Sequence, residues 1–260
     1  MTVLPFFQVD AFASRPFEGN QAAVIPLDQW LDDAILQAIA AENNLSETAF
    51  TVPSQDGAAD YNLRWFTPTV EVDLCGHATF AAAHILLRGA GICFSTRSGI
   101  LTVTRDGDLL RMSLPAYAIE QREFPEIMQA LGLEQGETFF GRGAEGAAII
   151  LLADEAAVRA VTPDFAALAK FNELVIVTAL GNEQAIASRV FAAGFGINED
   201  PVTGAAHAAL VPFWAERLGR TSFTALQASK RSGVLECELR GDRVLLGGQA
   251  VTVIEGHFQL

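Results

Sequence analysis

GHATFAAAHILLRG, residues 76–89, is an alanine-rich apolar segment that carries no polar face. A helix that is apolar all round is expected to be buried on every side. Arg88-Gly89 at its end is typical of a helix C-terminus. A second segment, GAAHAALVPFWAERLG at 204–219, follows the same plan. Pro212 inside it is expected to kink or interrupt the helix.

The two segments belong to a longer repeat. Both contain the spacing G-x-A-x-x-A, and an acid comes shortly before each, Asp73 in the first half and Asp200 in the second. Arg-x-Phe occurs further back in both halves, at 64–66 and 189–191. A repeat this long predicts two copies of one α/β unit, because solenoid repeats have periods of only ~20–50 residues. A coincidence between short alanine-rich motifs is the alternative. The boundary that fits both halves gives an N-terminal domain of residues 1–114 and a C-terminal domain of residues 115–249.

Short apolar runs elsewhere predict strands. In the first half these are VLPFFQV, QAAVIPL, TAFTV and YNLRWF, and an amphipathic helix over 31–39 should stop at Asn43-Asn44. In the second half a short helix is expected over 124–131, and strands are expected at LVIVTA and over 188–195.

The composition restricts the partners and the compartment. The 260 residues carry a formal net charge of −14, which repels phosphate backbones and anionic lipids, so neither nucleic acid nor a membrane surface is expected as a partner. No stretch reaches the ~18 apolar residues of a membrane span, and MTVLPFFQVD lacks the basic region of a signal peptide. Three scattered cysteines fit neither a disulfide framework nor a zinc ribbon. We expect a reduced, cytoplasmic protein.

The starts of the two apolar helices are candidate anion sites. The first turn of a helix leaves backbone N–H groups unpaired and carries about half a positive charge. Gly76 and Gly204 would let a ligand approach the backbone, and the small Ala78 and Ala206 would keep the entrance open. Such local dipoles would have to hold a substrate carboxylate, since the net charge of the protein repels it. The alternative is that these small residues only let each helix pack tightly against a sheet.

Glu47 is the candidate for proton transfer. It lies in NNLSETAF, between the first helix and a strand, with Leu45 and Ala49-Phe50 as apolar neighbours. An acid among apolar groups holds its proton more tightly, which suits a group that must take up and return a proton near neutral pH. A capping or turn carboxylate after Ser46 is the alternative.

Other ionisable residues lie near the two helix starts. His77 stands in the first turn of its helix, where the dipole disfavours an imidazolium, so a neutral His77 is expected. A capping or core histidine is the alternative there, and an N-cap or turn role is the alternative for Asp200. His207 is open to a structural role, His84 falls in mid-helix and is expected to be packed, and His257 carries no signal.

Cys75 stands beside a helix N-terminus, where a thiol is acidified and can act as a base or a nucleophile. The matching stretch of the second half, 200–203, contains no cysteine, so a mechanism with two opposed thiols lacks its partner. Cys75 is therefore expected to be a small buried residue. No group of His, Cys or Asp has the spacing of metal ligands, and no phosphate-binding fingerprint follows a strand. We expect neither a metal nor a cofactor.

The chain resembles the PhzF-like proteins of phenazine biosynthesis, a family related in fold to diaminopimelate epimerase and proline racemase. The segments that carry the resemblance occur in the family's order along the whole chain: VDAFASRPFEGNQAAVIPL, NNLSETAF, LRWFTPTVEVDLCGHATFAAAHIL, FGINEDPVTGAAHAAL and GGQAVTVIEGHFQL. The resemblance implies an α+β fold of two similar domains, each a β-sheet or barrel wrapped around a central helix, with the active site between them. It also implies that a terminal strand, about 250–260, returns to the first domain, and that the protein is a homodimer.

The family's founding reaction implies an isomerase that shifts an allylic proton on a small carboxylic acid without a metal or an organic cofactor. Glu47 matches the family's proton shuttle, and His77 and Asp200 match residues that assist catalysis and binding. The residues expected to bind substrate are Asn20, Gly76, Ala78, Gly204 and Ala205. The chain departs from the family at Gln21, where proline is usual, and at Ala205, where serine is usual. The missing hydroxyl removes one hydrogen bond to a ligand, so the founding substrate is not assumed here.

Three hypotheses follow. The first is an isomerase acting at a carbon activated by a carboxylate or an enol, with Glu47 as base and then acid. The second is a thiol-dependent racemase or epimerase that uses Cys75. The third is a non-catalytic protein that binds a small acid.

Overall fold

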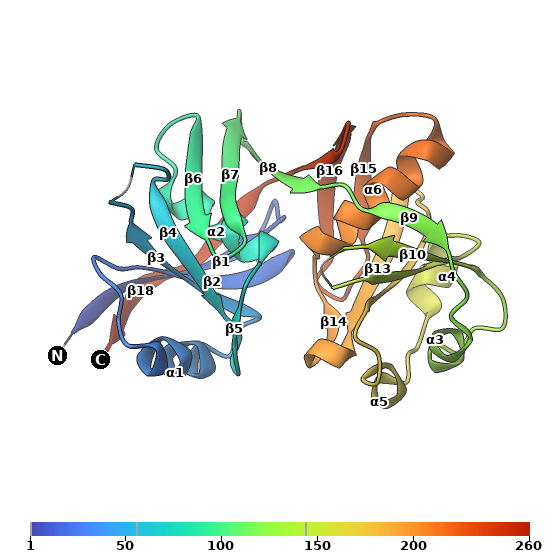
Figure 1. The fold of residues 1–260 in the computed structure, drawn as a ribbon, viewed down its shortest axis with the longest axis horizontal. Coiled ribbons are helices and arrows are strands. Elements are labelled where there is room, and N and C mark those ends of the chain that lie inside the picture. Colours follow the sequence, from blue (N-terminus) through green and yellow to red (C-terminus); the bar gives the residue numbers. More distant parts are fainter. Residues whose placement is uncertain (1, 56, 144) are drawn as a thin grey trace. The chain divides into compact units, whose positions relative to one another are not determined.

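The computed structural model describes residues 2–55, 57–143 and 145–260. The chain divides into unit 1, formed by Met1–Ser113 and Gly247–Leu260, and unit 2, formed by Leu114–Leu246 (Figure 1). None of the helices in the described part of the chain has the length and apolarity of a membrane span.

The strands of the first part of the chain are β1 (Val3–Ala11), β2 (Asn20–Pro26), β3 (Glu47–Pro53), β4 (Tyr61–Phe66), β5 (Glu71–Val72), β6 (Gly91–Thr96), β7 (Gly99–Asp106) and β8 (Leu109–Pro115). With β18 (Ala250–Gln259) they pair in the order β18–β1–β2–β3–β4–β6–β7–β8, and β5 pairs with the end of β4. The β2–β3 and β4–β6 pairs are parallel, and the others are antiparallel. The predicted strand YNLRWF is confirmed as β4.

Helix α2 (Gly76–Leu86) packs inside this sheet, against β1, β2, β3 and β18. All residues from His77 to Ala83 are buried, which confirms the prediction from the missing polar face. The helix ends before Arg88-Gly89 because Leu87 is already extended. Helix α1 (Asp33–Asn43) packs against β3 and β4 and buries Leu36 and Ile39.

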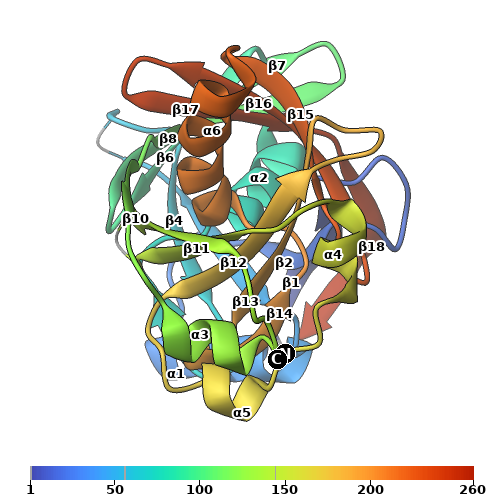
Figure 2. The same ribbon diagram turned by 90° about the vertical axis from the view of Figure 1, so that its right-hand side faces the viewer.

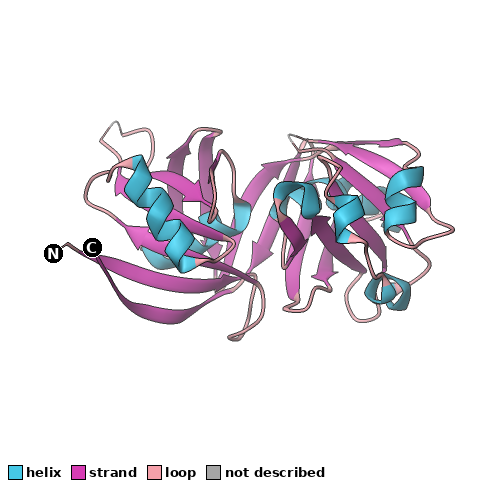
Figure 3. Ribbon diagram, turned by 90° about the horizontal axis from the view of Figure 1, so that it is seen from below, coloured by secondary structure: helices cyan, strands magenta, loops and turns pink. Residues whose placement is uncertain are grey.

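Strand β18 pairs with β1 along its whole length, from Val3↔Gln259 to Ala11↔Ala250. The register shifts once, between Gln8 and Val9. The two chain ends lie side by side in Figure 3, and the backbone N–H of Thr2 donates to the carbonyl of Leu260 at 3.0 Å. The first strand of unit 1 is therefore completed by a strand from the other end of the chain.

The strands that follow are β9 (Ala118–Gln121), β10 (Glu137–Arg142), β11 (Ala147–Leu151), β12 (Leu174–Leu180), β13 (Ile186–Ala192), β14 (Ile197–Asp200), β15 (Ser222–Gln227), β16 (Gly233–Arg240) and β17 (Arg243–Gly248). The helices are α3 (Pro125–Ala130), α4 (Glu155–Ala160), α5 (Phe165–Leu168) and α6 (Gly204–Leu218) (Figure 2). The strand predicted over 188–195 ends at Ala192, because Ala193–Phe195 forms a 3₁₀ turn closed by Gly196 at φ 86°.

The pairing pattern of unit 1 recurs in unit 2. In unit 2 the pair β11–β12 is parallel, β12–β13 is antiparallel and β13–β15 is parallel. In unit 1 the pairs β2–β3, β3–β4 and β4–β6 have the same types in the same order. The short β14 pairs with β13 as β5 pairs with β4. In both units a buried helix, α2 or α6, follows the short strand.

Helix α6 continues through Pro212, so the expected interruption does not occur. Proline has no N–H to donate to the carbonyl of Ala208, four residues earlier. That carbonyl accepts instead from the backbone N–H of Tyr117, at 3.0 Å. The hydrogen bond that the helix loses at Pro212 is thus replaced by one from outside it.

Candidate functional site

Glu47 is the first residue of β3 and pairs with Ala22 of the parallel strand β2. The chain reaches it through Asn44, which ends α1 in the left-handed region at φ 48°. This turn brings the start of β3 to the start of α2, and Glu47 is only 8% exposed. Its carboxylate oxygen Oε2 lies 3.0 Å from Nε2 of His77, in the first turn of α2.

The other ring nitrogen of His77 has its own neighbours. The side-chain amide nitrogen of Asn20 lies 3.2 Å from Nδ1, and the sulfur of Cys75 lies 3.6 Å from it. Ser46 donates its hydroxyl to Oδ1 of Asn20 at 3.2 Å. A connected row of side chains therefore runs from Ser46 through Asn20 and His77 to Glu47.

Asn20 was expected to contact the substrate, but its side chain is fully buried. Its known contacts, to His77 and Ser46, make it a support for the imidazole. From the sequence, Ser46 was noted only as a neighbour of Glu47, and its contact with Asn20 was missed. Its hydroxyl next to the glutamate, in LSETAF, could have indicated a place in the site.

The surroundings of His77 act on its pKa in opposite directions. Burial disfavours the imidazolium, but the neighbouring Cys75 sulfur and Glu47 carboxylate outweigh burial, and the pKa of His77 is raised. A carboxylate 3.0 Å from the ring favours its protonated form, which opposes the effect of the helix end.

Cys75 is buried, as predicted, although its contact with His77 was missed. Burial, and then the charge of Glu47, raise the pKa of the Cys75 thiol to about 11. The residue is a thiol near neutral pH and not the acidified group that a helix N-terminus alone would produce.

Glu47, Cys75 and His77 also place possible metal-ligand atoms within 4.8 Å of one another. Sequence spacing did not reveal this group, since Glu47 comes from a separate strand. The imidazole, however, stands between the other two side chains, with Nε2 towards Glu47 and Nδ1 towards Cys75. A single ion would need one ring nitrogen facing both partners, so this arrangement does not fit a three-ligand site.

Asp200 belongs to unit 2, where it is the last residue of β14 and 9% exposed. Its carboxylate accepts a hydrogen bond from the hydroxyl of Thr203, the residue that precedes α6. The fully buried Gln227 fixes both: its amide nitrogen donates to the backbone carbonyl of Asp200 at 2.7 Å, and its Oε1 accepts from the backbone N–H of Thr203 at 2.8 Å. Gln227 was not singled out from the sequence.

His207 lies one turn into α6 and is fully buried. Its Nδ1 donates to the carbonyl of Thr203 at 2.8 Å. Burial lowers the pKa of His207 to about 4, so the ring is neutral near pH 7. This environment agrees with the structural role considered for it.

The remaining predicted residues occupy the two helix starts. Gly76 is the first residue of α2 and is partly exposed, whereas Ala78 is fully buried in the helix packing. Gly204 begins α6 and is buried, and Ala205 beside it is partly exposed. Of these residues, Gly76 and Ala205 are the partly exposed ones.

The match of Asp73 with Asp200 between the two halves is wrong. Asp73 has 74% of its side chain exposed, unlike the buried Asp200, and does not occupy an equivalent position. The equivalent acids are Glu71, on β5, and Glu199, on β14, since both lie five residues before the first glycine of the following helix.

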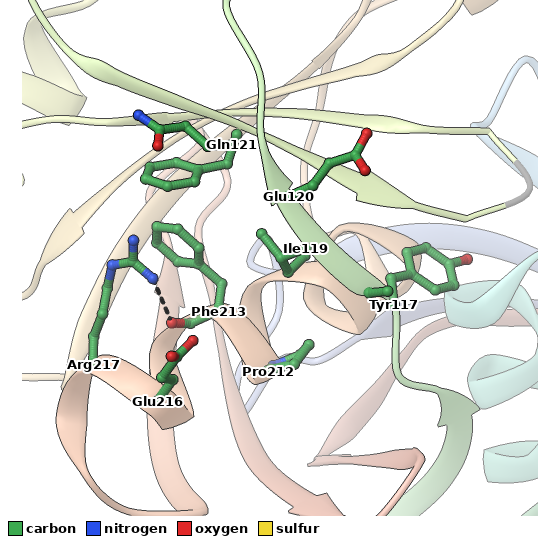
Figure 4. Close-up of a pocket in the computed structure, with 10 residues that line it drawn as sticks. Tyr117, Ile119, Glu120, Gln121, Pro212, Phe213, Glu216 and Arg217 are labelled. Atoms are coloured by element: carbon green, nitrogen blue, oxygen red, sulfur yellow. Dashed lines mark hydrogen bonds between the residues drawn. The ribbon is translucent and has the colours of Figure 1, made fainter.

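Two cavities in the described part of the chain lie apart from all of these residues. One, of about 330 Å³, lies in unit 2 beside β9 and the second half of α6, and Phe213 and Arg217 form part of its wall (Figure 4). The other, of about 290 Å³, lies in unit 1 among residues such as Val3, Pro26 and Tyr61. Neither contains a predicted site residue.

The architecture and the site define an α+β protein with a buried carboxylate–imidazole pair at the start of an enclosed helix. Residues 9–256 match the family model of phenazine biosynthesis-like proteins, PhzC-PhzF, and the chain belongs to this family.

Three relatives illustrate the likeness. A Pseudomonas aeruginosa protein named as an uncharacterized isomerase is 50% identical over an alignment of 264 positions that covers 99% of each chain. The crystal structure of a PhzF-family protein from Enterococcus faecalis superposes with a TM-score of 0.93 at 43% identity and covers 100% of both chains. A hydroxyproline epimerase from Agrobacterium vitis has a TM-score of 0.62 at 13% identity, over 98% of this chain and 92% of its own, and shows a shared fold alone. The predicted epimerase-like α+β fold class is thereby confirmed.

Proposed function

We propose that this isomerase shifts a proton within a small carboxylic-acid substrate, with Glu47 as the proton shuttle. The observation that carries the proposal is the buried contact between Glu47 and His77. The isomerase relative from Pseudomonas aeruginosa supports the reaction class. No organic cofactor or metal is included in the proposal.

In the proposed reaction Glu47 removes a proton from a carbon next to an activating carboxylate or enol, and the electron pair stays on the substrate as an enolate. Glu47 then returns the proton to a second carbon, so no oxidant or reductant is needed. The oxygen that does not face His77, Oε1, would take the proton. The N–H at Nε2 of His77, beside Oε2, would donate a hydrogen bond to the ionised form of Glu47 and stabilise it before and after each transfer.

The substrate carboxylate is assigned to the N–H groups at the helix starts, at Gly76 in unit 1 and at Gly204 and Ala205 in unit 2. Asp200, held by Thr203, would bind a polar group of the substrate. Because Ala205 has no hydroxyl, we propose a substrate different from that of relatives with serine there. His77 and Asp200 are thus assigned the assisting roles.

The organisation of the molecule is part of the proposal. We assign residues 1–114, with the strand at about 250–260, and residues 115–249 to two domains of one repeated design. The recurring strand pairing supports the repeat. Three cysteines without disulfide bonds agree with a reduced, cytoplasmic setting. Assembly as a homodimer is proposed from the family resemblance.

A thiol-dependent racemase is the second candidate. The Cys75 sulfur is close to His77, which favours it, but a thiol with a pKa of about 11 is a poor nucleophile at neutral pH. The corresponding position before α6 is Thr203, which supplies no second thiol.

The test is incubation of the protein with a panel of unsaturated and hydroxylated carboxylic acids in heavy water, followed by mass spectrometry. The wild type should introduce deuterium into one class of acid, and Glu47→Gln should abolish the uptake while ligand binding persists. Glu155→Gln is the matched control, since Glu155 is also buried and paired, with Arg159, but lies outside the proposed site. Full uptake by Glu47→Gln would rule out the shuttle, and binding without any uptake by the wild type would favour a non-catalytic protein.

A further inference from the structure

Arg64 and Glu71 form a bidentate ion pair in unit 1. Nε of Arg64 donates to Oε1 of Glu71 at 2.7 Å, and Nη2 donates to Oε2 at 2.8 Å. The remaining nitrogen, Nη1, donates to Asp33, the first residue of α1, at 2.9 Å. Only 18% of the Arg64 side chain and 14% of the Glu71 side chain are exposed. One guanidinium therefore joins β4, β5 and α1.

Unit 2 contains the same pair on the equivalent strands. Nε of Arg189, on β13, donates to Oε1 of Glu199, on β14, at 2.8 Å, and Nη2 donates to Oε2 at 3.0 Å. The remaining nitrogen, Nη1, again connects to a helix: it donates to the carbonyl of Val161, just after α4, at 2.7 Å. In both units one guanidinium thus connects two strands and one helix, and the helix is α1 in unit 1 and α4 in unit 2.

The surroundings of the two arginines also agree. Each begins an Arg-x-Phe motif, and the guanidinium of Arg64 lies 5.1 Å from the ring centre of Phe66, as that of Arg189 lies 4.9 Å from Phe191. Each partner glutamate stands on the short strand from which the chain enters α2 or α6. Because the same ion pair occurs at the equivalent position of both units, we expect it to have the same role in each.

Short strand pairings hold the chain between each glutamate and the next helix, and in unit 2 the side chain of Gln227 also holds Asp200 and Thr203. Strand β5 is two residues long and pairs with two residues of β4. Strand β14 meets β13 across an irregularity in the register. These segments lead directly to His77 in one unit and include Asp200 in the other. A guanidinium fork fixes both the distance and the rotation of a carboxylate, which a lysine ammonium cannot do.

We propose that Arg64–Glu71 and Arg189–Glu199 are positioning pairs, each of which sets the entry into its buried helix and so the placement of His77 or Asp200. This inference rests on the proposed function, because placement matters to catalysis only if these residues take part in it. Neither arginine touches the substrate in this proposal. Their effect is transmitted through the backbone between the glutamate and the helix.

The test uses three lysine variants of the full chain. Arg64→Lys and Arg189→Lys keep the charge and remove the fork, and Arg97, 2.7 Å from Glu71, still neutralises that carboxylate. Arg240→Lys is the matched control. Arg240 donates two hydrogen bonds to the carboxylate of Glu238, at 2.7 and 3.0 Å, but it is exposed and no helix follows it in the described part of the chain.

The histidines report on the two helix starts separately. Their ring resonances are recorded by NMR and assigned by the loss of a signal in His77→Gln and in His207→Gln. Arg64→Lys should shift the His77 resonance and leave His207 in place. Arg189→Lys should shift His207, which is bonded to Thr203 at the start of α6, and leave His77 in place. Arg240→Lys should move neither. With an acid found by the heavy-water panel, kcat for deuterium uptake should fall by roughly 10²-fold in both positioning variants, the loss typical of a small misplacement, with little change in KM.

Unmoved His77 and His207 resonances in the folded lysine variants would overturn the inference, as would equal shifts in Arg240→Lys. If a lysine variant does not fold, Glu71→Gln or Glu199→Gln replaces it, with the same expected shifts. The outcome is separable from the proposed function. Full deuterium uptake by Glu47→Gln would remove the shuttle and leave the resonance shifts standing, whereas unmoved resonances with inactive Glu47→Gln would remove the positioning pairs alone.

Discussion

The side-chain amide of Asn20 lies 3.2 Å from Nδ1 of His77, although 57 positions separate the two residues in sequence. The backbone delivers Asn20 through Gly19, which has φ +66°, and a Cβ on Gly19 would overlap the carbonyl of Ala11. The contact to His77 therefore depends on a glycine next to the residue that makes it.

Gly19→Ala is expected to displace Asn20 and to lower both deuterium uptake and stability, the latter by about 1–3 kcal/mol from the strained backbone alone. Gly57→Ala is the control, because Gly57 has a similar φ of +70° but open space around a Cβ. Thermal melts and uptake rates measure the two effects. A loss of uptake in both variants would show that the backbone conformation matters and the position of Asn20 does not.

Removing the imidazole should destabilise the fold. His77→Gln leaves the carboxylate of Glu47 buried without the ring, and breaking a buried charge pair from one side costs about 3–5 kcal/mol. His84→Gln, which loses a partly buried contact to Thr252, should cost about 1 kcal/mol. Urea unfolding at pH 7 compares the two. Equal costs would mean that the carboxyl group of Glu47 needs no partner in the folded protein.

His207 should make the protein sensitive to acid. Its folded pKa, about 4, lies below the value of about 6.5 in an unfolded chain, so the unfolded state binds the extra proton between these values. Stability should therefore be complete above pH 6.5 and fall as the pH drops towards 4, with a total loss on the order of 3 kcal/mol from this group. The free energy of unfolding measured across this range should lose that slope in His207→Gln. A slope that survives the substitution would assign the acid sensitivity to other groups.

The Glu47 shuttle and the thiol-dependent racemase predict different properties for Cys75, and we expect those of an unreactive thiol. With its pKa at about 11, alkylation of Cys75 by iodoacetamide should be slow at pH 7 and rise about tenfold per pH unit towards pH 10, as the thiolate fraction does. Peptide mass spectrometry separates it from the partly exposed Cys93. Cys75→Ala should retain deuterium uptake, and abolished uptake in that folded variant would revive the racemase hypothesis.

Local sequence was sufficient for most elements of the fold. The period of YNLRWF and the apolar composition after Gly76 are properties of single segments, and both produced the expected strand and buried helix. Element ends were less secure, as at Leu87, because backbone dihedrals there depend on the following loop. Of the kink or break predicted at Pro212, the break does not occur, and its compensating donor, Tyr117, is far away in sequence.

The candidate site was only partly predictable. Glu47 and His77 were chosen from motifs, but their contact arises from the parallel pairing of β2 and β3, which brings Ser46 beside Asn20 as well. Aligning the halves by acids near the glycines paired Asp73 with Asp200. The loop between arginine and glutamate differs in length between the halves, and the strand ladders agree with the equal spacing to the following glycine in showing that Glu71 and Glu199 correspond.

Strand β18 has a consequence for folding. It follows the whole of unit 2 in the chain, yet it covers the edge of β1, which precedes unit 2. Unit 2 can therefore close without β18, whereas unit 1 keeps an open backbone edge that invites wrong partners until β18 is in place. A chain truncated before Ala250 should have a protease-sensitive first unit and a resistant second unit.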